Sequence, residues 1–169
     1  MWTGSVVSIY VASSAAAPTR TVEEARAVAG KGLEGDRYFD GRGTWSAHPG
    51  SGREVTLIES EALDALESEA GPHFAPGAHR RNVVTRGVPL NHLVGHDFRI
   101  GEVVLRGTRL CEPCEHLEKL TQPGIKMAAL HRSGLRADVI QEGSIRIGDV
   151  VEEKAESGSA QLDPIGRHF

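Results

Sequence analysis

Arg99-Ile100-Gly101-Glu102-Val103-Val104 is a short stretch that recurs nearly unchanged as Arg146-Ile147-Gly148-Asp149-Val150-Val151. In each copy the glycine permits a tight turn or a bulge, and the acidic residue and two valines that follow resume a strand. Two such corners, in a chain whose short strands are spread over its length, favour a mainly β fold. We expect a closed or half-closed, mostly antiparallel β-barrel with short peripheral helices rather than a layered α/β sheet.

Apolar patterns outside the two corners predict the remaining strands and one clear helix. Residues 3–11 are expected to form a strand because apolar and polar side chains alternate there. Further strands are expected at 54–58, 82–85, 98–110, 135–140 and 144–152, with 98–110 as a hairpin or bent strand. A helix is expected from about residue 60 to 70, where apolar residues share one face, and shorter helical turns at 89–94 and 126–132. Residues 21–29 have features of both strand and helix.

The composition is that of a soluble globular domain. The chain has 169 residues, of which 39% are hydrophobic and 25% charged. This predicts one domain at residues 1–152, followed by a tail at 153–169 that has no periodic pattern. The net charge of −4 argues against a protein built to coat nucleic acid, and no apolar run approaches the ~20 residues of a membrane span. Two cysteines are too few for a secreted disulfide scaffold, and no basic residue precedes Arg20 as a signal peptide requires, so we expect a cytoplasmic protein.

The strongest local motif is Leu110-Cys111-Glu112-Pro113-Cys114-Glu115-His116. A thiol acts as a nucleophile or a soft-metal ligand only as the thiolate. Cys114 follows a proline where a strand is expected to pass into a helical turn, and the positive end of that turn favours the thiolate, while Glu112 and Glu115 oppose it. His116 is placed to act as a base or a second ligand, so Cys114 and His116 are the candidate catalytic pair. Cys111 should be the more buried thiol, because alternation places it on the apolar face of the preceding strand.

Three other interpretations of the cysteine pair remain open. A structural zinc site needs two further soft ligands, and none stands at finger spacing. A thioredoxin-like redox pair expects a βαβ context that the sequence does not show. Both cysteines can also be buried simply as small apolar side chains.

Two segments are candidates for anion binding. Gly32-Leu33-Glu34-Gly35-Asp36-Arg37 is a turn whose backbone N–H groups can face an anion, although it lacks the ending of a P-loop; a tight turn with a surface ion pair is the simpler interpretation. His79-Arg80-Arg81-Asn82 lies at a strand start, where alternation lets at most one of the two arginines line a pocket. We predict that Arg81, Asn82 and the 32–37 turn converge on one concavity with Cys114; the alternative is a solvated basic patch.

Taken in order, these segments resemble the MOSC domain family, named after the C-terminal domain of molybdenum-cofactor sulfurases. The resembling segments are residues 32–37, 55–58, 80–90, 93–101, 111–114, 135–140 and 145–151. The ordered series runs from about residue 3 to 152, nearly the whole chain. The resemblance is to a stand-alone, single-domain member of the family.

The resemblance implies a barrel-like β fold and a functional cysteine that ligates molybdenum or handles sulfur. The family's key cysteine follows the proline or an equivalent residue, so it corresponds to Cys114, whereas Cys111 matches an optional position. The implied cofactor is the molybdenum cofactor, a molybdopterin, with Cys114 as the metal ligand. The cofactor-binding candidates are Gly32, Gly35, Asp36, Arg37, Arg81, Asn82 and Cys114.

Two functions follow from the resemblance and a third from the residues alone. The first is a molybdenum-cofactor-binding or sulfur-handling protein with a reactive cysteine, either a reductase of N-hydroxylated compounds or part of cofactor sulfuration. The second is a non-catalytic persulfide carrier or partner-docking module, and the third is a small-molecule-binding barrel with an inert cysteine. Since the chain contains neither a pyridoxal-phosphate domain nor an electron-transfer domain, a desulfurase or a redox partner would be a separate protein. No nucleic-acid or membrane partner is expected.

Overall fold

Strands make up most of the regular structure. The computed structural model describes residues 1–48, 50–70 and 76–155. Its strands are β1 (Thr3–Val11), β2 (Arg20–Val22), β3 (Glu24–Val28), β4 (Gly32–Leu33), β5 (Val55–Glu59), β6 (Val83–Arg86), β7 (Asp97–Ile100), β8 (Val103–Leu110), β9 (Leu135–Gln141), β10 (Gly143–Arg146) and β11 (Val150–Glu153). Its helices are α1 (Ser60–Ala70), α2 (Glu115–Leu120) and α3 (Ile125–Ala128), with a 3-10 turn η1 (Leu90–Leu93).

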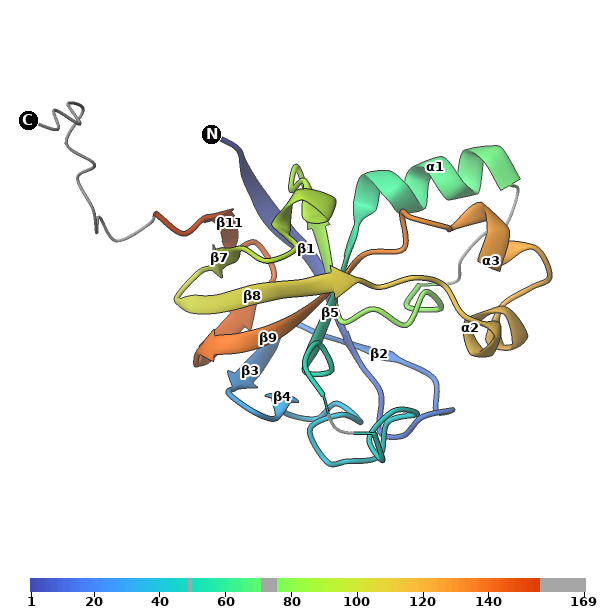
Figure 1. The fold of residues 1–169 in the computed structure, drawn as a ribbon, viewed down its shortest axis with the longest axis horizontal. Coiled ribbons are helices and arrows are strands. Elements are labelled where there is room, and N and C mark those ends of the chain that lie inside the picture. The colour runs from blue at the N-terminus through green and yellow to red at the C-terminus, as the bar shows by residue number, and fades with distance from the viewer. Residues whose placement is uncertain (49, 71–75, 156–169) are drawn as a thin grey trace, which may run out of the picture.

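Seven strands close into a barrel because β11 pairs with both β7 and β1 (Figure 1). The order around the barrel is β11-β7-β8-β9-β5-β6-β1, and β2 pairs with the far half of β1. Neighbouring strands are antiparallel except for β5 and β6, which α1 connects. A smaller sheet, β10-β3-β4, lies beside the barrel. The expected closed, mostly antiparallel barrel is therefore confirmed.

The two copies of the Ile-Gly corner lie side by side where the barrel closes. The first copy runs from β7 into β8 and the second from β10 into β11. Ile100 stands opposite Val151, and the Gly101 N–H donates to the Val150 carbonyl at 3.0 Å. Gly101 (φ 56°) and Gly148 (φ 88°) both take the left-handed backbone conformation that glycine permits. At Gly148 the chain leaves β10 and enters β11, which divides the single strand expected at 144–152.

Apolar side chains fill the barrel. Ile9 on β1, Leu57 on β5, Phe98 on β7, Leu105 on β8 and Leu135 on β9 are all fully buried and belong to one core cluster. Strand alternation directs these side chains inward and their neighbours outward. Because the interior is packed, polar groups that meet a ligand have to lie at the ends of the strands and in the loops that leave them.

The helices lie toward one end of the barrel, on the right in Figure 1. α1 has the bounds expected from the sequence and buries Ala62 and Leu66. The turns expected at 89–94 and 126–132 correspond to η1 and to α3, which is shorter than expected. None of the helices in the described part of the chain is long and apolar enough to cross a membrane.

For two segments the sequence pattern did not decide the structure. Residues 21–29, with their mixed pattern, contribute to β2 and β3. The expected tail at 153–169 starts at the last residue of β11, and residues 156–169 lie outside the described residues. The boundary between domain and tail therefore stays a prediction.

Candidate functional site

A small pocket of about 50 Å³ forms where loops from distant parts of the chain meet. Its lining residues are Arg37, Tyr38, Thr44, Trp45, Thr56, Arg80, Arg81, Cys111, Cys114, His116, Leu117 and Arg136. A single phosphate or carboxylate group fits such a space. We call it the thiol pocket.

The two cysteines of the thiol pocket differ in exposure. Cys111 follows β8, is only 2% exposed, and its N–H donates to the Gly134 carbonyl at 2.7 Å. Cys114 is partly exposed and stands at the start of α2, where its carbonyl accepts a hydrogen bond from the Glu118 N–H at 3.1 Å. The prediction that Cys111 is the more buried thiol is confirmed, and Cys114 is the thiol that solvent reaches more readily.

Arg81 lines the thiol pocket, but most of its N–H groups donate hydrogen bonds to other groups of the protein. Its Nε donates to the Ser133 carbonyl at 2.8 Å, and its Nη2 donates to the Ser133 Oγ at 2.6 Å and to the Cys111 carbonyl at 3.1 Å. Its Nη1 donates to the His79 carbonyl at 3.1 Å. Arg81 thus ties the cysteine segment to the loop before β9, and its predicted part in cofactor binding stays a prediction.

Arg80 lines the same pocket, which the sequence analysis did not expect. Strand alternation would have allowed only one of Arg80 and Arg81 to do so, and this expectation is wrong. The reason is that β6 begins only at Val83 and Arg80 has a left-handed backbone (φ 61°). The Arg80 guanidinium donates to the carbonyls of Ala17 at 2.7 Å and Ala15 at 2.8 Å, and burial lowers the pKa of Arg80.

The 32–37 turn contributes one wall of the thiol pocket through Arg37. The fully buried Asp36 holds this wall in place, because its Oδ1 accepts hydrogen bonds from the Ala12 N–H and the Arg37 Nη1, both at 3.0 Å. Gly32 and Gly35 do not line the pocket; both have positive φ, and a Cβ on Gly32 would lie 2.4 Å from the Glu54 carbonyl oxygen. The two glycines therefore shape the turn.

Asn82 lies beside the thiol pocket without lining it. Its Oδ1 accepts from the N–H and Oγ1 of Thr56, both at 3.1 Å, and its Nδ2 donates to the Tyr10 carbonyl at 3.1 Å. Asn82 thus links β5, through Thr56, to β1, through Tyr10, next to the pocket. Arg81, Arg37 and Cys114 therefore line one pocket, whereas Asn82, Gly32 and Gly35 do not line it.

The thiol pocket carries unbalanced positive charge. Of its four arginines, Arg37 has a carboxylate partner, and among the described residues no ion pair involves Arg80, Arg81 or Arg136. The adjacent His79 adds no charge, since burial and then the Arg81 charge lower the pKa of His79 to about 3. His116, the other candidate catalytic residue, lies at the pocket with its Nε2 3.4 Å from the Ala15 carbonyl oxygen.

The model of one protein family, the MOSC domain, matches residues 45–152. The chain belongs to the MOSC domain family. That family is associated with molybdenum-cofactor or sulfur-related functions. A search of curated proteins finds no match.

Solved structures share the fold of this MOSC domain at low sequence identity. The YUAD protein from Bacillus subtilis is 20% identical with a TM-score of 0.73, over 89% of this chain and 97% of that chain. YiiM from Geobacillus stearothermophilus is 19% identical with a TM-score of 0.68, over 91% and 77% of the two chains. YiiM from Escherichia coli is 18% identical with a TM-score of 0.62, over 94% and 72%. At these identities the likeness shows a common fold.

Sequence reasoning about this MOSC domain missed Arg136. It lies on β9 between the buried Leu135 and Ala137, so alternation directs its side chain away from the core. Its Nη1 reaches the Gly52 carbonyl at 3.4 Å, from the glycine-rich loop that precedes β5. A charged residue between two core positions of a family-like segment is the signal that could have pointed to it.

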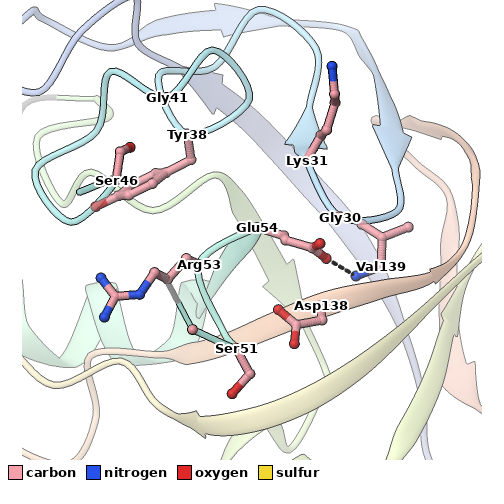
Figure 2. Close-up of a pocket in the computed structure, with 11 residues that line it drawn as sticks. Gly30, Lys31, Tyr38, Gly41, Ser46, Ser51, Arg53, Glu54, Asp138 and Val139 are labelled. Atoms are coloured by element: carbon pink, nitrogen blue, oxygen red, sulfur yellow. Dashed lines mark hydrogen bonds between the residues drawn. The ribbon is translucent and has the colours of Figure 1, made fainter. Parts of the chain in front are cut away.

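A second, larger cavity of about 340 Å³ adjoins the thiol pocket, and Tyr38 lines both (Figure 2). Glu54 and Asp138 point into it from the start of β5 and from β9. Burial raises the pKa of Glu54, whose carboxylate accepts from the Val139 N–H at 2.5 Å, and the nearby Asp138 raises it further. Asp138 accepts from the Gly52 N–H at 2.7 Å. The glycine-rich loop therefore separates a cationic compartment from one that contains carboxylates.

Proposed function

We propose that this MOSC domain binds a molybdenum cofactor or handles sulfur through the Cys114 thiol. The observation that carries the proposal is the position of Cys114: it is the more exposed thiol, and it faces a pocket with three arginines that have no described carboxylate partner. Thiolate is the form of a cysteine that ligates metals and attacks sulfur. Cys111, which is buried beside it, supports the segment.

The residues present fit a molybdenum cofactor that brings its own metal ligands. Among the described residues no group of three or more His, Cys, Asp or Glu side chains could hold a metal ion, so Cys114 would add a single soft ligand to a metal already bound by sulfur. The arginines suit the phosphate that molybdopterin carries. The thiol pocket brings these arginines and Cys114 together at one site.

A bound molybdenum cofactor would supply a redox-active metal for the reduction of N-hydroxylated compounds. In that reaction Cys114 would hold the metal and the arginines would hold the anionic group. His116, which lines the same pocket with its Nε2 3.4 Å from the Ala15 carbonyl oxygen, would exchange the proton. Electrons would come from a separate redox partner.

A persulfide carrier is the second candidate, because that role needs only an accessible thiol and Cys114 is the more exposed of the two cysteines. The Cys114 thiolate attacks the outer sulfur of a persulfide donor, the S–S bond of the donor breaks, and the donor leaves as a thiol with the proton that Cys114 lost. The added sulfur needs little space, and a persulfide anion is stabilised by the arginines. A desulfurase would be the donor partner.

Metal and sulfur analysis of freshly purified protein distinguishes the two candidates. The chain would be expressed in a host that makes molybdopterin, and molybdenum and sulfane sulfur per chain would be measured for the native protein, Cys114→Ser and Cys111→Ser. Molybdenum that is lost in Cys114→Ser and kept in Cys111→Ser supports cofactor binding. Sulfane sulfur with the same dependence, without molybdenum, supports the carrier. If neither is found, or if neither depends on Cys114, the proposal is wrong.

A further inference from the structure

We propose that Arg136 is the anion-recognising side chain of the thiol pocket, and that the molecule meeting Cys114 carries an oxyanionic group, a phosphate or a carboxylate, that Arg136 binds. The inference rests on the proposed function only in using the same pocket. It requires neither molybdenum nor a persulfide.

The other arginines of the pocket each donate two or more hydrogen bonds to the protein. Arg81 makes four hydrogen bonds to Ser133, Cys111 and His79. The remaining two behave alike: Arg80 donates through Nη1 and Nη2 to two carbonyls, and Arg37 donates to Asp36 and to the Arg80 carbonyl at 3.3 Å. They contribute positive charge, and their hydrogen bonds to the protein hold each guanidinium in a fixed orientation.

Arg136 is in a different situation. Among the described residues, its side chain makes one hydrogen bond, from Nη1 to the Gly52 carbonyl at 3.4 Å, close to the limit for such a bond. A guanidinium has five N–H donors, so most of those of Arg136 remain available. The side chain is partly buried and lines the pocket. A planar guanidinium fork with free donors matches a phosphate or carboxylate.

The size and charge of the pocket agree with a single oxyanion. Its volume of about 50 Å³ suits one such group next to the Cys114 thiol. Arg80 and Arg81 add charge at close range, in a space where partial burial weakens solvent screening. Asp36, the buried acid next to Arg37 in the chain, already accepts hydrogen bonds from Arg37 and from the Ala12 N–H.

Two features of the neighbouring strand hold Arg136 apart from other partners. Arg109, its cross-strand neighbour on β8, is exposed and donates to the Ser51 carbonyl at 3.2 Å, and it does not line the pocket. Asp138, two residues along β9, faces the larger cavity and is bound to Gly52. The acid nearest in sequence is therefore occupied on the other side of the loop.

Alkylation of Cys114 by a charged and a neutral reagent tests the proposal. Rates for iodoacetate and iodoacetamide at Cys114 would be measured by peptide mass spectrometry in the native protein, Arg136→Gln, Arg136→Lys and the control Arg99→Gln, which alters an exposed arginine on β7. We expect the iodoacetate-to-iodoacetamide rate ratio to fall roughly three- to tenfold in Arg136→Gln, the size expected for one unit charge at close range and partial screening. Arg136→Lys should keep part of the preference, and Arg99→Gln all of it.

An unchanged ratio in Arg136→Gln, or an equal fall of both rates, overturns the proposal, because the second result would mean that Arg136 acts on the thiol and not on the anion. Competition separates the two sources of anion: protection of Cys114 by inorganic phosphate at lower concentration than by acetate indicates a phosphate ester, and the reverse indicates a carboxylate. Protection by neither contradicts an anion site. Measuring the rate ratio requires neither molybdenum nor sulfane sulfur. The anion proposal can therefore be confirmed when the proposed function is wrong, and the proposed function can be confirmed when the anion proposal is wrong.

Discussion

The Arg81 guanidinium donates a hydrogen bond to the backbone carbonyl of Cys111 at 3.1 Å, and the same nitrogen donates to the Ser133 Oγ at 2.6 Å. One buried side chain therefore fixes the cysteine segment to the loop that leads into β9. This makes the position of the Cys114 thiol depend on a residue that need not touch the ligand. The dependence can be measured separately from ligand binding.

Arg81→Lys should lower the free energy of unfolding by about 2–4 kcal/mol. A lysine ammonium cannot reach all four acceptors of the guanidinium, and it leaves buried carbonyl oxygens without partners. Urea denaturation of the variant and of Arg99→Lys, an exposed control, measures the difference. A loss no larger than that of the control would contradict the structural role of Arg81.

Cys114 should be alkylated before Cys111, and the two serine variants should differ in kind. Cys111→Ser places a hydroxyl at a 2% exposed position and should cost about 1–3 kcal/mol if that hydroxyl finds no partner. Cys114→Ser should leave stability nearly unchanged and abolish cofactor or sulfur binding, since an alcohol is a poor ligand and nucleophile at neutral pH. Mass-spectrometric mapping and denaturation of both variants check this. Faster labelling of Cys111 would reverse the assignment.

Gly52→Ala should destabilise the protein more than Gly95→Ala. Both glycines have positive φ (75° and 80°), so the backbone strain that an alanine introduces is similar at the two sites. A Cβ on Gly52 would lie 2.3 Å from the Thr108 Oγ1 and 3.2 Å from the Arg136 Cβ, whereas one on Gly95 meets nothing within 4 Å. We expect an extra loss of about 1–3 kcal/mol at Gly52. Equal melting temperatures for the two variants would show that the loop can move aside.

His79 should make the protein less stable as the pH falls. In the folded chain burial and the Arg81 charge lower its pKa to about 3, from an ordinary value of 6.5, so the folded state keeps the ring neutral where the unfolded state binds a proton. The contribution of the neutral His79 ring to the free energy of unfolding is complete above pH 6.5 and is lost as the pH falls toward 3. His79→Asn retains an acceptor for the Arg81 N–H, which bonds the His79 Nδ1 at 2.9 Å, without the titration. Denaturation midpoints at pH 7, 5.5 and 4.5 should therefore converge for the two proteins; a constant difference would contradict the assignment.

The sequence predicted the barrel because its strongest signals act locally. The glycines at 101 and 148 permit local turns, alternation placed Cys111 inside, and the proline before Cys114 indicated an exposed turn. Arg80 was misjudged because its backbone is set by the segment before β6, and its side chain by carbonyls more than sixty residues earlier. Arg136 was missed for a related reason: its place at the thiol pocket arises from loops that meet only in the folded chain. Long-range packing of this kind leaves little trace in local patterns.

The pairing of β11 with both β1 and β7 also bears on how the chain folds during synthesis. The barrel can close only when residues 150–153 have been synthesised. β1 is synthesised first, so the edge of β1 that pairs with β11 stays uncovered until nearly the whole described chain has been made. Contacts so distant in sequence slow folding, and an uncovered strand edge invites pairing with another chain. A nascent chain that stops short of β11 would thus expose two open edges, one on β1 and one on β7. The four residues of β11, one of the seven strands of the barrel, therefore separate a closed barrel from a nascent chain with edges open to aggregation.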